Sequence, residues 1–117
     1  MECNPLYSKD TPWGKWEVLL ETKQCKVKRI TVNPNKRLSY QTHKHREESW
    51  LIIKGIATVV LNGTESTLKP GDSTFIEKQA AHRIGNFGDE DVQFIEIQRG
   101  EYFGEDDIIR LQDDFGR

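Results

Sequence analysis

The sequence predicts an all-β fold, because short segments rich in β-branched and aromatic residues alternate with turn signals. None of these segments repeats its apolar residues at the helical period over three turns. Short strands separated by turns every 8–12 residues or so are typical of a β-sandwich or barrel. The 117 residues contain no internal repeat and no linker-like segment. We therefore expect one domain over residues 1–117.

The strands are expected where β-branched and aromatic residues gather. In chain order they are Trp16–Leu20, Lys26–Val32, Leu38–His43, Ser49–Ile53, Ile56–Leu61, Ser73–Ile76, His82–Asn86 and Val92–Gln98. Asn62-Gly63 is the strongest hairpin signal between them, because both residues tolerate the positive φ of a tight turn. The three tryptophans, Trp13, Trp16 and Trp50, are expected to pack in the core or at a dimer interface.

Charge and composition exclude several classes of function. With 17 Lys and Arg against 19 Asp and Glu, the formal charge is −2, which argues against a nucleic-acid partner and against an anionic membrane surface. No apolar run approaches the ~20 residues of a membrane span, and the first ten residues do not resemble a secretory signal. Cys3 and Cys25 form no metal-binding pattern. We expect reduced thiols and a cytoplasmic location.

Two of the expected strands have an unusual polar face. Alternation places Gln41, His43 and His45 on one side of the first. On the last strand Glu96 and Gln98 share one side and the isoleucines occupy the other. Such a polar side is either solvated or lines a pocket, and the alternation alone is compatible with both.

The three histidines lie in two compact segments, and this distribution indicates a metal site. His43 and His45 are followed closely by Glu48, and His82 lies on a distant strand. Ligands two apart on a strand, a carboxylate on the next strand and a distant histidine can surround one ion. Imidazole, carboxylate and amide donors suit Zn, Fe, Mn, Co or Ni.

These spacings resemble the two sequence motifs of the cupin family. Gln41-x-His43, Glu48 and Gly55 fit the first motif, with Gln41 in place of the usual histidine, and Gly71, His82 and Asn86 fit the second. The customary Pro and Gly of the second motif are replaced by Glu77 and Gln79. An alternative register uses His43 and His45 as the ligand pair. We prefer Gln41 and His43, because this register also places Glu48 and Gly55.

The resemblance extends to a narrower family, the mannose-6-phosphate isomerase domain of type II phosphomannose isomerases, from about Pro12 to Arg117. It is carried by Pro12-Trp13-Gly14, the segment from Leu38 to Arg46, Glu48 and Trp50, and the ending Gly104-Glu-Asp-Asp-Ile-Ile-Arg110 with Asp114-Phe-Gly-Arg117. Lys44 and Ser49 depart from the family, whose bifunctional members more often carry histidine there. The nucleotidyltransferase portion of those bifunctional proteins is absent from these residues.

The resemblance implies a single-domain cupin, a double-stranded β-helix or jelly-roll barrel. It also implies an isomerase that interconverts mannose 6-phosphate and fructose 6-phosphate with one divalent metal ion, Zn first and Co, Mn, Ni or Fe as alternatives. The implied metal ligands are Gln41, His43, Glu48 and His82. The implied catalytic residues are Glu96 and Arg117, and the implied substrate-binding residues are Lys28, Arg46, Gln98 and Arg110. The expected partners are a phosphorylated hexose and a second copy of the chain, as a homodimer.

Two other functions remain compatible with the sequence. One is a non-catalytic cupin that binds a metal or a sugar phosphate. The departures from the family pattern at Lys44 and Ser49 favour this alternative. The other is a different cupin enzyme such as a small Fe(II) dioxygenase, because the same ligand types bind iron. A shared fold does not separate these functions.

Overall fold

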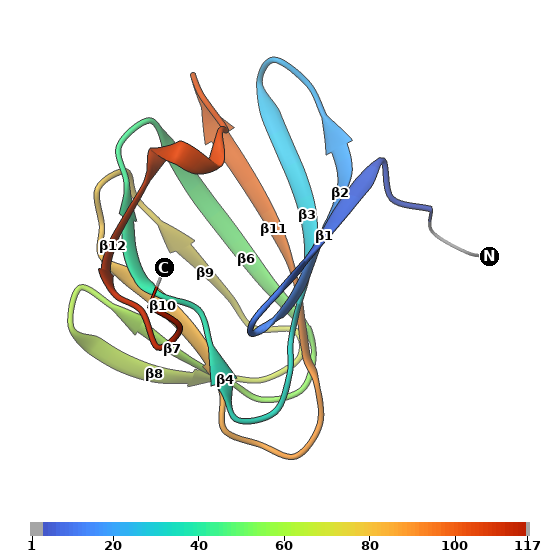
Figure 1. Ribbon diagram of the computed structural model, residues 1–117, viewed down its shortest axis with the longest axis vertical. Coiled ribbons are helices and arrows are strands. Elements are labelled where there is room, and N and C mark those ends of the chain that lie inside the picture. Colours follow the sequence, from blue (N-terminus) through green and yellow to red (C-terminus); the bar gives the residue numbers. More distant parts are fainter. Residues whose placement is uncertain (1–3, 117) are drawn as a thin grey trace.

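Two antiparallel sheets face each other in the computed structural model, which describes residues 4–116 (Figure 1). The first sheet has the order β1 (Tyr7–Thr11), β2 (Gly14–Glu21), β3 (Cys25–Val32), β11 (Val92–Gly100), β6 (Arg46–Lys54), β9 (Ser73–Ile76). The second has the order β12 (Ile108–Gln112), β5 (Tyr40–His43), β10 (His82–Asn86), β7 (Ala57–Leu61), β8 (Thr64–Leu68), and β4 (Lys36–Arg37) also pairs with β10. A short 3₁₀ turn, η1 (Glu105–Asp107), precedes β12.

The predicted all-β class is therefore confirmed, and so are the central strands. β7 and β8 form the expected hairpin, in which Asn62 and Gly63 have φ angles of 48° and 82°. Gly55 of the first motif also has a positive φ of 79°, and a Cβ at this position would lie 2.5 Å from the Asp91 carbonyl oxygen. Only glycine fits such a site without strain. Among the described residues no helix is long and apolar enough to cross a bilayer.

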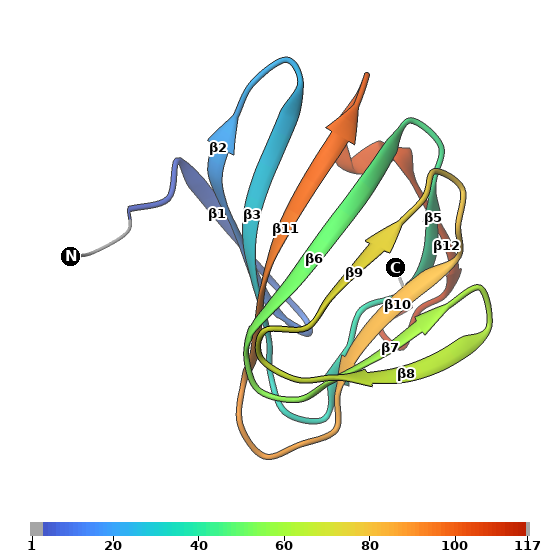
Figure 2. The ribbon, with the colours of Figure 1, turned by 180° about the vertical axis from the view of Figure 1, so that it is seen from behind.

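Four strands, β1, β4, β8 and β12, lie outside the segments predicted from the sequence. Most residues of β1, β8 and β12 are exposed, so their burial does not alternate along the strand. An edge strand with little buried surface leaves no period-2 pattern to detect. Figure 2 shows β8 at the rim of the second sheet and β1 beside the N-terminus.

The interior between the sheets is apolar at one end and charged at the other. β3, β6 and β11 each carry polar inward side chains at one end and apolar ones at the other, and the antiparallel register aligns the like ends. The apolar end holds a cluster of Trp13, Ile30, Val32, Trp50, Ile52, Ala57, Val59, Ile76, Ala80, Ile84, Val92 and Phe94, with Trp16 packed against it. The core placement of the tryptophans is thus confirmed.

The polar face of β11 points into the charged end of the interior. Glu96 is 5% exposed and Gln98 is fully buried, whereas Ile97 on the opposite face is 41% exposed. Glu96 pairs in register with Lys28 on one side and with Trp50 on the other. The polar face therefore points into the barrel, and Glu96 is buried rather than exposed to solvent.

Candidate metal centre

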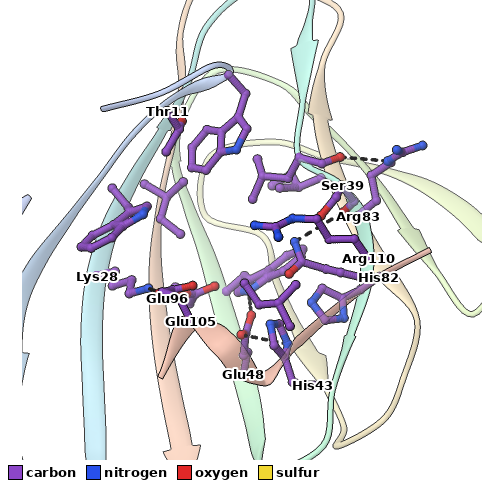
Figure 3. Close-up of a pocket in the computed structure, with 18 of the residues that line it drawn as sticks. Thr11, Lys28, Ser39, His43, Glu48, His82, Arg83, Glu96, Glu105 and Arg110 are labelled. Carbon is purple, nitrogen blue, oxygen red and sulfur yellow. Dashed lines mark hydrogen bonds and ion pairs between the residues drawn. The ribbon is translucent and has the colours of Figure 1, made fainter. Parts of the chain in front are cut away.

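Three of the predicted metal ligands meet inside the barrel. His43 ends β5, Glu48 lies near the start of β6, and His82 begins β10. One donor atom from each lies within 4.8 Å of the other two, and all three residues are buried (Figure 3). The two imidazole rings are 4.8 Å apart between centroids. Two histidines and a carboxylate at this spacing fit a divalent transition-metal ion.

The fourth predicted ligand, Gln41, lies beside this cluster. Its Cα pairs in register with that of His82, and it precedes His43 by two residues, so all three share the inner face of the sheet. Gln41 is 7% exposed and lines the same cavity. Its amide Nε2 donates to the Ser39 carbonyl at 3.4 Å. The placement suits an amide ligand, and the ligand role itself stays a prediction.

Hydrogen bonds decide the tautomer of His82. Its Nδ1 lies 2.9 Å from the Ala80 carbonyl oxygen, which only accepts, so Nδ1 carries the proton. Burial lowers the pKa of His82 below its usual value. The ring is therefore neutral at pH 7 and Nε2 keeps a free lone pair, the state in which histidine binds metals.

His43 is also neutral, for a different set of reasons. Burial, the Arg46 guanidinium and His82 together lower its pKa to about 3. Arg46 donates from Nη2 to His43 Nε2 at 2.8 Å, so the ring proton is on Nδ1, 3.4 Å from a Glu48 oxygen.

Glu48 is held by two further donors. Trp50 Nε1 donates to Oε1 at 2.9 Å and Arg46 Nε donates to Oε2 at 3.0 Å. Both donors are buried. A carboxylate fixed at both oxygens cannot turn freely, and this orients it toward the two histidines.

Glu96 is a second carboxyl group in the same chamber. Gln98 Nε2 donates to its Oε2 at 2.9 Å, and burial, followed by the nearby Glu48, raises the pKa of Glu96 to about 8. Glu96 lines the cavity, whereas Gln98 is not among the cavity-lining residues. The structure thus places Gln98 behind Glu96, as its hydrogen-bond partner.

The alternative ligand pair of His43 and His45 is not supported by the geometry. β5 ends at His43, and His45 faces outward, with Nδ1 3.6 Å from Glu101 and its ring against Tyr102. Asp107 holds this bend, because its carboxylate accepts from the backbone N–H groups of Lys44 and His45 at 3.2 and 3.0 Å. Spacing in the sequence does not reveal this contact, which joins residues more than sixty positions apart.

The predicted cations occupy different surroundings. Lys28 is buried, pairs with Glu105 and lies over the Trp16 ring at 4.6 Å. Arg46 is 3% exposed and contacts the proposed ligands rather than the surface. Arg110 is exposed at the cavity, and Arg117 lies outside the described residues.

The cavity that contains these groups has a volume of about 190 Å³. Its wall includes residues that the sequence analysis did not assign to a site, among them Thr11, Trp13, Trp16 and Ser39. These residues come from the β1–β2 hairpin and from the segment before β5. No local pattern could have indicated them, because only the folding of this hairpin against the barrel brings them to the cavity.

Comparison with known proteins decides the family. The sequence model described as "Mannose-6-phosphate isomerase C-terminal" matches residues 6–113. The chain belongs to this family. Two relatives of this mannose-6-phosphate isomerase C-terminal domain are a mannose-1-phosphate guanylyltransferase of Klebsiella pneumoniae and the alginate biosynthesis protein AlgA of Pseudomonas aeruginosa. They are 44% and 42% identical over 106 residues, which is 91% of this chain and 22% of each relative. The chain spans about a fifth of the length of these relatives.

Solved structures confirm the double-stranded β-helix of this mannose-6-phosphate isomerase C-terminal domain. A Klebsiella pneumoniae protein with a double-stranded β-helix domain has a TM-score of 0.69 and 27% identity, covering 75% of this chain and 77% of that one. The capsular polysaccharide assembling protein CapF of Staphylococcus aureus has a TM-score of 0.82 and 19% identity, covering 93% of this chain and 33% of that one. The second likeness concerns the fold alone. The cupin prediction is therefore confirmed.

Proposed function

We propose that this domain is a metal-dependent isomerase that interconverts mannose 6-phosphate and fructose 6-phosphate. The observation that carries the proposal is the cluster of His43, Glu48 and His82, buried at a cavity that Glu96 also lines. The description of the family to which the chain belongs names mannose-6-phosphate isomerase. The guanylyltransferase names of the relatives belong to proteins about four times as long, of which this chain matches 22%.

The metal site would be formed by His43, Glu48 and His82, with Gln41 as the fourth ligand. A divalent cation, Zn first among the candidates, supplies Lewis-acid polarisation of the sugar carbonyl when bound. The protein supplies neutral imidazoles, which need no deprotonation before they bind a cation. It also supplies one carboxylate that Trp50 and Arg46 hold in place.

Glu96 is the proposed proton-transfer group. An aldose–ketose isomerisation removes a proton from one of two neighbouring carbons and returns a proton to the other, so a single group can serve both steps. Glu96 lines the cavity next to Glu48, and Gln98 orients its carboxyl group. Among the described acidic residues of the cavity wall, Asp10 and Glu105 are exposed, and Glu48 is committed to the proposed metal site.

The substrate phosphate requires cations, and arginine suits it by its fork geometry. Arg110 is exposed at the cavity, whereas Lys28 and Arg46 are buried in it and are already paired with carboxylates. This geometry favours Arg110 as the main contact of the substrate phosphate. Substrate contacts also stay predictions for Lys28, Arg46, Gln98 and Arg117.

A coupled assay on mannose 6-phosphate tests the function, with the purified protein supplied in turn with Zn²⁺, Co²⁺, Mn²⁺, Ni²⁺ or Fe²⁺. We expect turnover with at least one metal, and loss of metal content and turnover in His82→Ala. Lys44→Ala is the matched control, because Lys44 is exposed and does not line the cavity. A folded protein without turnover under every metal would contradict the isomerase proposal. Unchanged metal content in His82→Ala would contradict the ligand set.

A further inference from the structure

Two buried hydroxyl groups of the cavity wall have no hydrogen-bond partner. Ser39 Oγ and Thr11 Oγ1 are two of the three fully buried side-chain polar atoms that lack a partner within residues 4–116. Both residues line the cavity, and Ser39 is only 1% exposed (Figure 3). A buried hydroxyl without a partner costs free energy in the folded state, so each such group calls for an explanation. A ligand that accepts hydrogen bonds from both hydroxyls would explain them together.

A cation lies on the Ser39 side of the cavity, and Thr11 lies on the opposite wall (Figure 3). Arg110 on β12 pairs in register with Gln41 on β5, and Ser39 precedes Gln41 by two residues, so their side chains belong to one face. Within the described part of the chain the Arg110 guanidinium makes no hydrogen bond and no ion pair. Figure 3 shows Arg110 near Ser39, across the cavity from the Lys28 and Glu96 side chains.

The β1 hairpin contributes the remaining groups. Lys9 pairs in register with Trp16, which packs against the core, so Lys9 and Thr11 share one side of β1, and Asp10 between them also lines the cavity. The cavity wall thus offers two hydroxyls without a partner and the exposed cations Lys9 and Arg110, with Asp10 as an exposed carboxylate among them, whereas the Arg83 guanidinium already donates to the Leu38 carbonyl. This chemistry selects an anion with several acceptor oxygens.

We propose that Thr11, Ser39 and Arg110 form the subsite for the phosphoryl group of the substrate, with Lys9 at its outer edge. The assignment of that anion to a hexose phosphate rests on the proposed function. Ser39 lies four residues before His43, a separation of at most about 13 Å in an extended chain. This span accommodates a six-carbon sugar whose reacting end lies at the metal cluster and whose phosphate lies at Ser39 and Arg110.

Binding measured without turnover tests the subsite. The metal-loaded protein is titrated with mannose 6-phosphate, mannose and inorganic phosphate, and the fluorescence of Trp13, Trp16 and Trp50, which line the cavity, reports occupancy. The wild type should bind mannose 6-phosphate much more tightly than mannose. Ser39→Ala and Thr11→Val should each weaken that binding about tenfold, and Arg110→Gln ten- to a hundredfold or so, with mannose binding little changed.

Stability gives a second readout that separates a ligand group from a structural one. Because Ser39 Oγ and Thr11 Oγ1 have no partner to lose, Ser39→Ala and Thr11→Val should unfold at the same temperature as the wild type or higher. Ser49→Ala and Arg99→Gln are the matched controls, since both residues are exposed on the outer face of the first sheet. They should leave the affinity for mannose 6-phosphate unchanged.

The outcomes separate this subsite from the isomerase proposal. Variants that bind mannose 6-phosphate as well as the wild type would overturn the subsite, and so would a wild type that binds mannose and mannose 6-phosphate equally. A lower unfolding temperature in both hydroxyl variants would assign the hydroxyls to the fold instead. Phosphate-selective binding that the variants lose, in a protein without isomerase turnover, would sustain the subsite and overturn the proposed reaction.

Discussion

The Arg46 guanidinium donates a hydrogen bond of 2.8 Å from Nη2 to His43 Nε2. This contact uses the one free lone pair of the imidazole, since Nδ1 then carries the proton. If His43 binds a metal through Nε2, the bond must break. If it binds through Nδ1, the proton must move to Nε2, and the bond breaks as well. A cation of the protein and a metal ion therefore compete for one histidine.

Replacing Arg46 by methionine should strengthen metal binding. The variant frees the His43 lone pair and removes a positive charge beside the site, so we expect roughly tenfold tighter binding by calorimetry. The metal-free variant should be less stable by about 3 kcal/mol or more, because the buried Glu48 loses its cation. Added metal should restore that stability. Weaker metal binding in the variant would show instead that Arg46 orients the ligands.

Replacing Glu96 by glutamine should reduce turnover without unfolding the protein. Glutamine keeps the volume and the hydrogen bond to Gln98 but cannot transfer a proton, so kcat should fall by about 10²- to 10⁴-fold. Metal content and mannose 6-phosphate affinity should stay near those of the wild type. Glu47→Gln, on the outer face of β6, is the control. A kcat within a few fold of the wild type would exclude Glu96 as the proton carrier.

Replacing Gln79 by glycine should stabilise the fold. Gln79 has a φ of 66° at the position where the cupin motif customarily has glycine, and its N–H donates to the His43 carbonyl at 2.7 Å. Glycine removes the strain of this conformation, but a glycine loses more conformational entropy when the chain folds. Because the relief of strain is the larger effect, the free energy of unfolding should rise by up to about 1 kcal/mol. Asn35→Gly, at a φ of 62° that asparagine tolerates, should gain less. Denaturant titration measures both, and a destabilised Gln79→Gly would contradict this explanation.

The ion pair between Glu17 and Arg29 should make stability depend on pH. Arg29 donates to both Glu17 oxygens at 2.9 Å, and these bonds lower the pKa of Glu17 below its usual 4.5. A lowered pKa in the folded state adds stability above pH 4.5, which is lost as the pH falls through the folded-state value. Glu17→Gln should therefore cost about 1 kcal/mol at pH 7, and the difference from the wild type should shrink below about pH 4.5. A difference that stays constant down to pH 2 would contradict this assignment. The exposed Glu65→Gln is the control.

The outer face of the first sheet supports the predicted homodimer. It carries five large apolar side chains that are 41–51% exposed, namely Leu20, Leu51, Ile53, Phe75 and Ile97. The charges at its two ends are paired with each other, Glu17 with Arg29 and Glu47 with Arg99. An apolar face whose neighbouring carboxylates are paired suits an identical face better than it suits a charged partner.

Light scattering after size-exclusion chromatography tests this dimer. We expect twice the 13.6 kDa of one chain, and one chain's mass for the double variant Leu51→Glu with Ile97→Glu. Ile109→Glu, on the outer strand β12 of the other sheet, should remain dimeric. A monomeric wild type, or a dimer that survives the double variant, would exclude this interface.

The residues that the sequence could identify are those whose spacing is local. Strand alternation places Gln41 and His43 on one face, and the motif spacing adds Glu48 and His82, so the composition of the metal cluster followed from sequence and resemblance. The hairpin at Asn62-Gly63 followed in the same way, because turn geometry depends on adjacent residues. The all-β class followed because segments rich in β-branched and aromatic residues alternate with closely spaced turn signals, which are local features as well.

Tertiary structure decided the features that depend on which side of a strand faces inward and on what meets it there. Alternation separated Glu96 and Gln98 from the isoleucines of β11, but only the packing of the two sheets placed the carboxyl group inside. The resemblance implied that Arg46 binds substrate, whereas only the fold brings its guanidinium to His43. Thr11 and Ser39 carry no pattern at all, since a hydroxyl becomes a binding group only when folding buries it at a cavity without a partner.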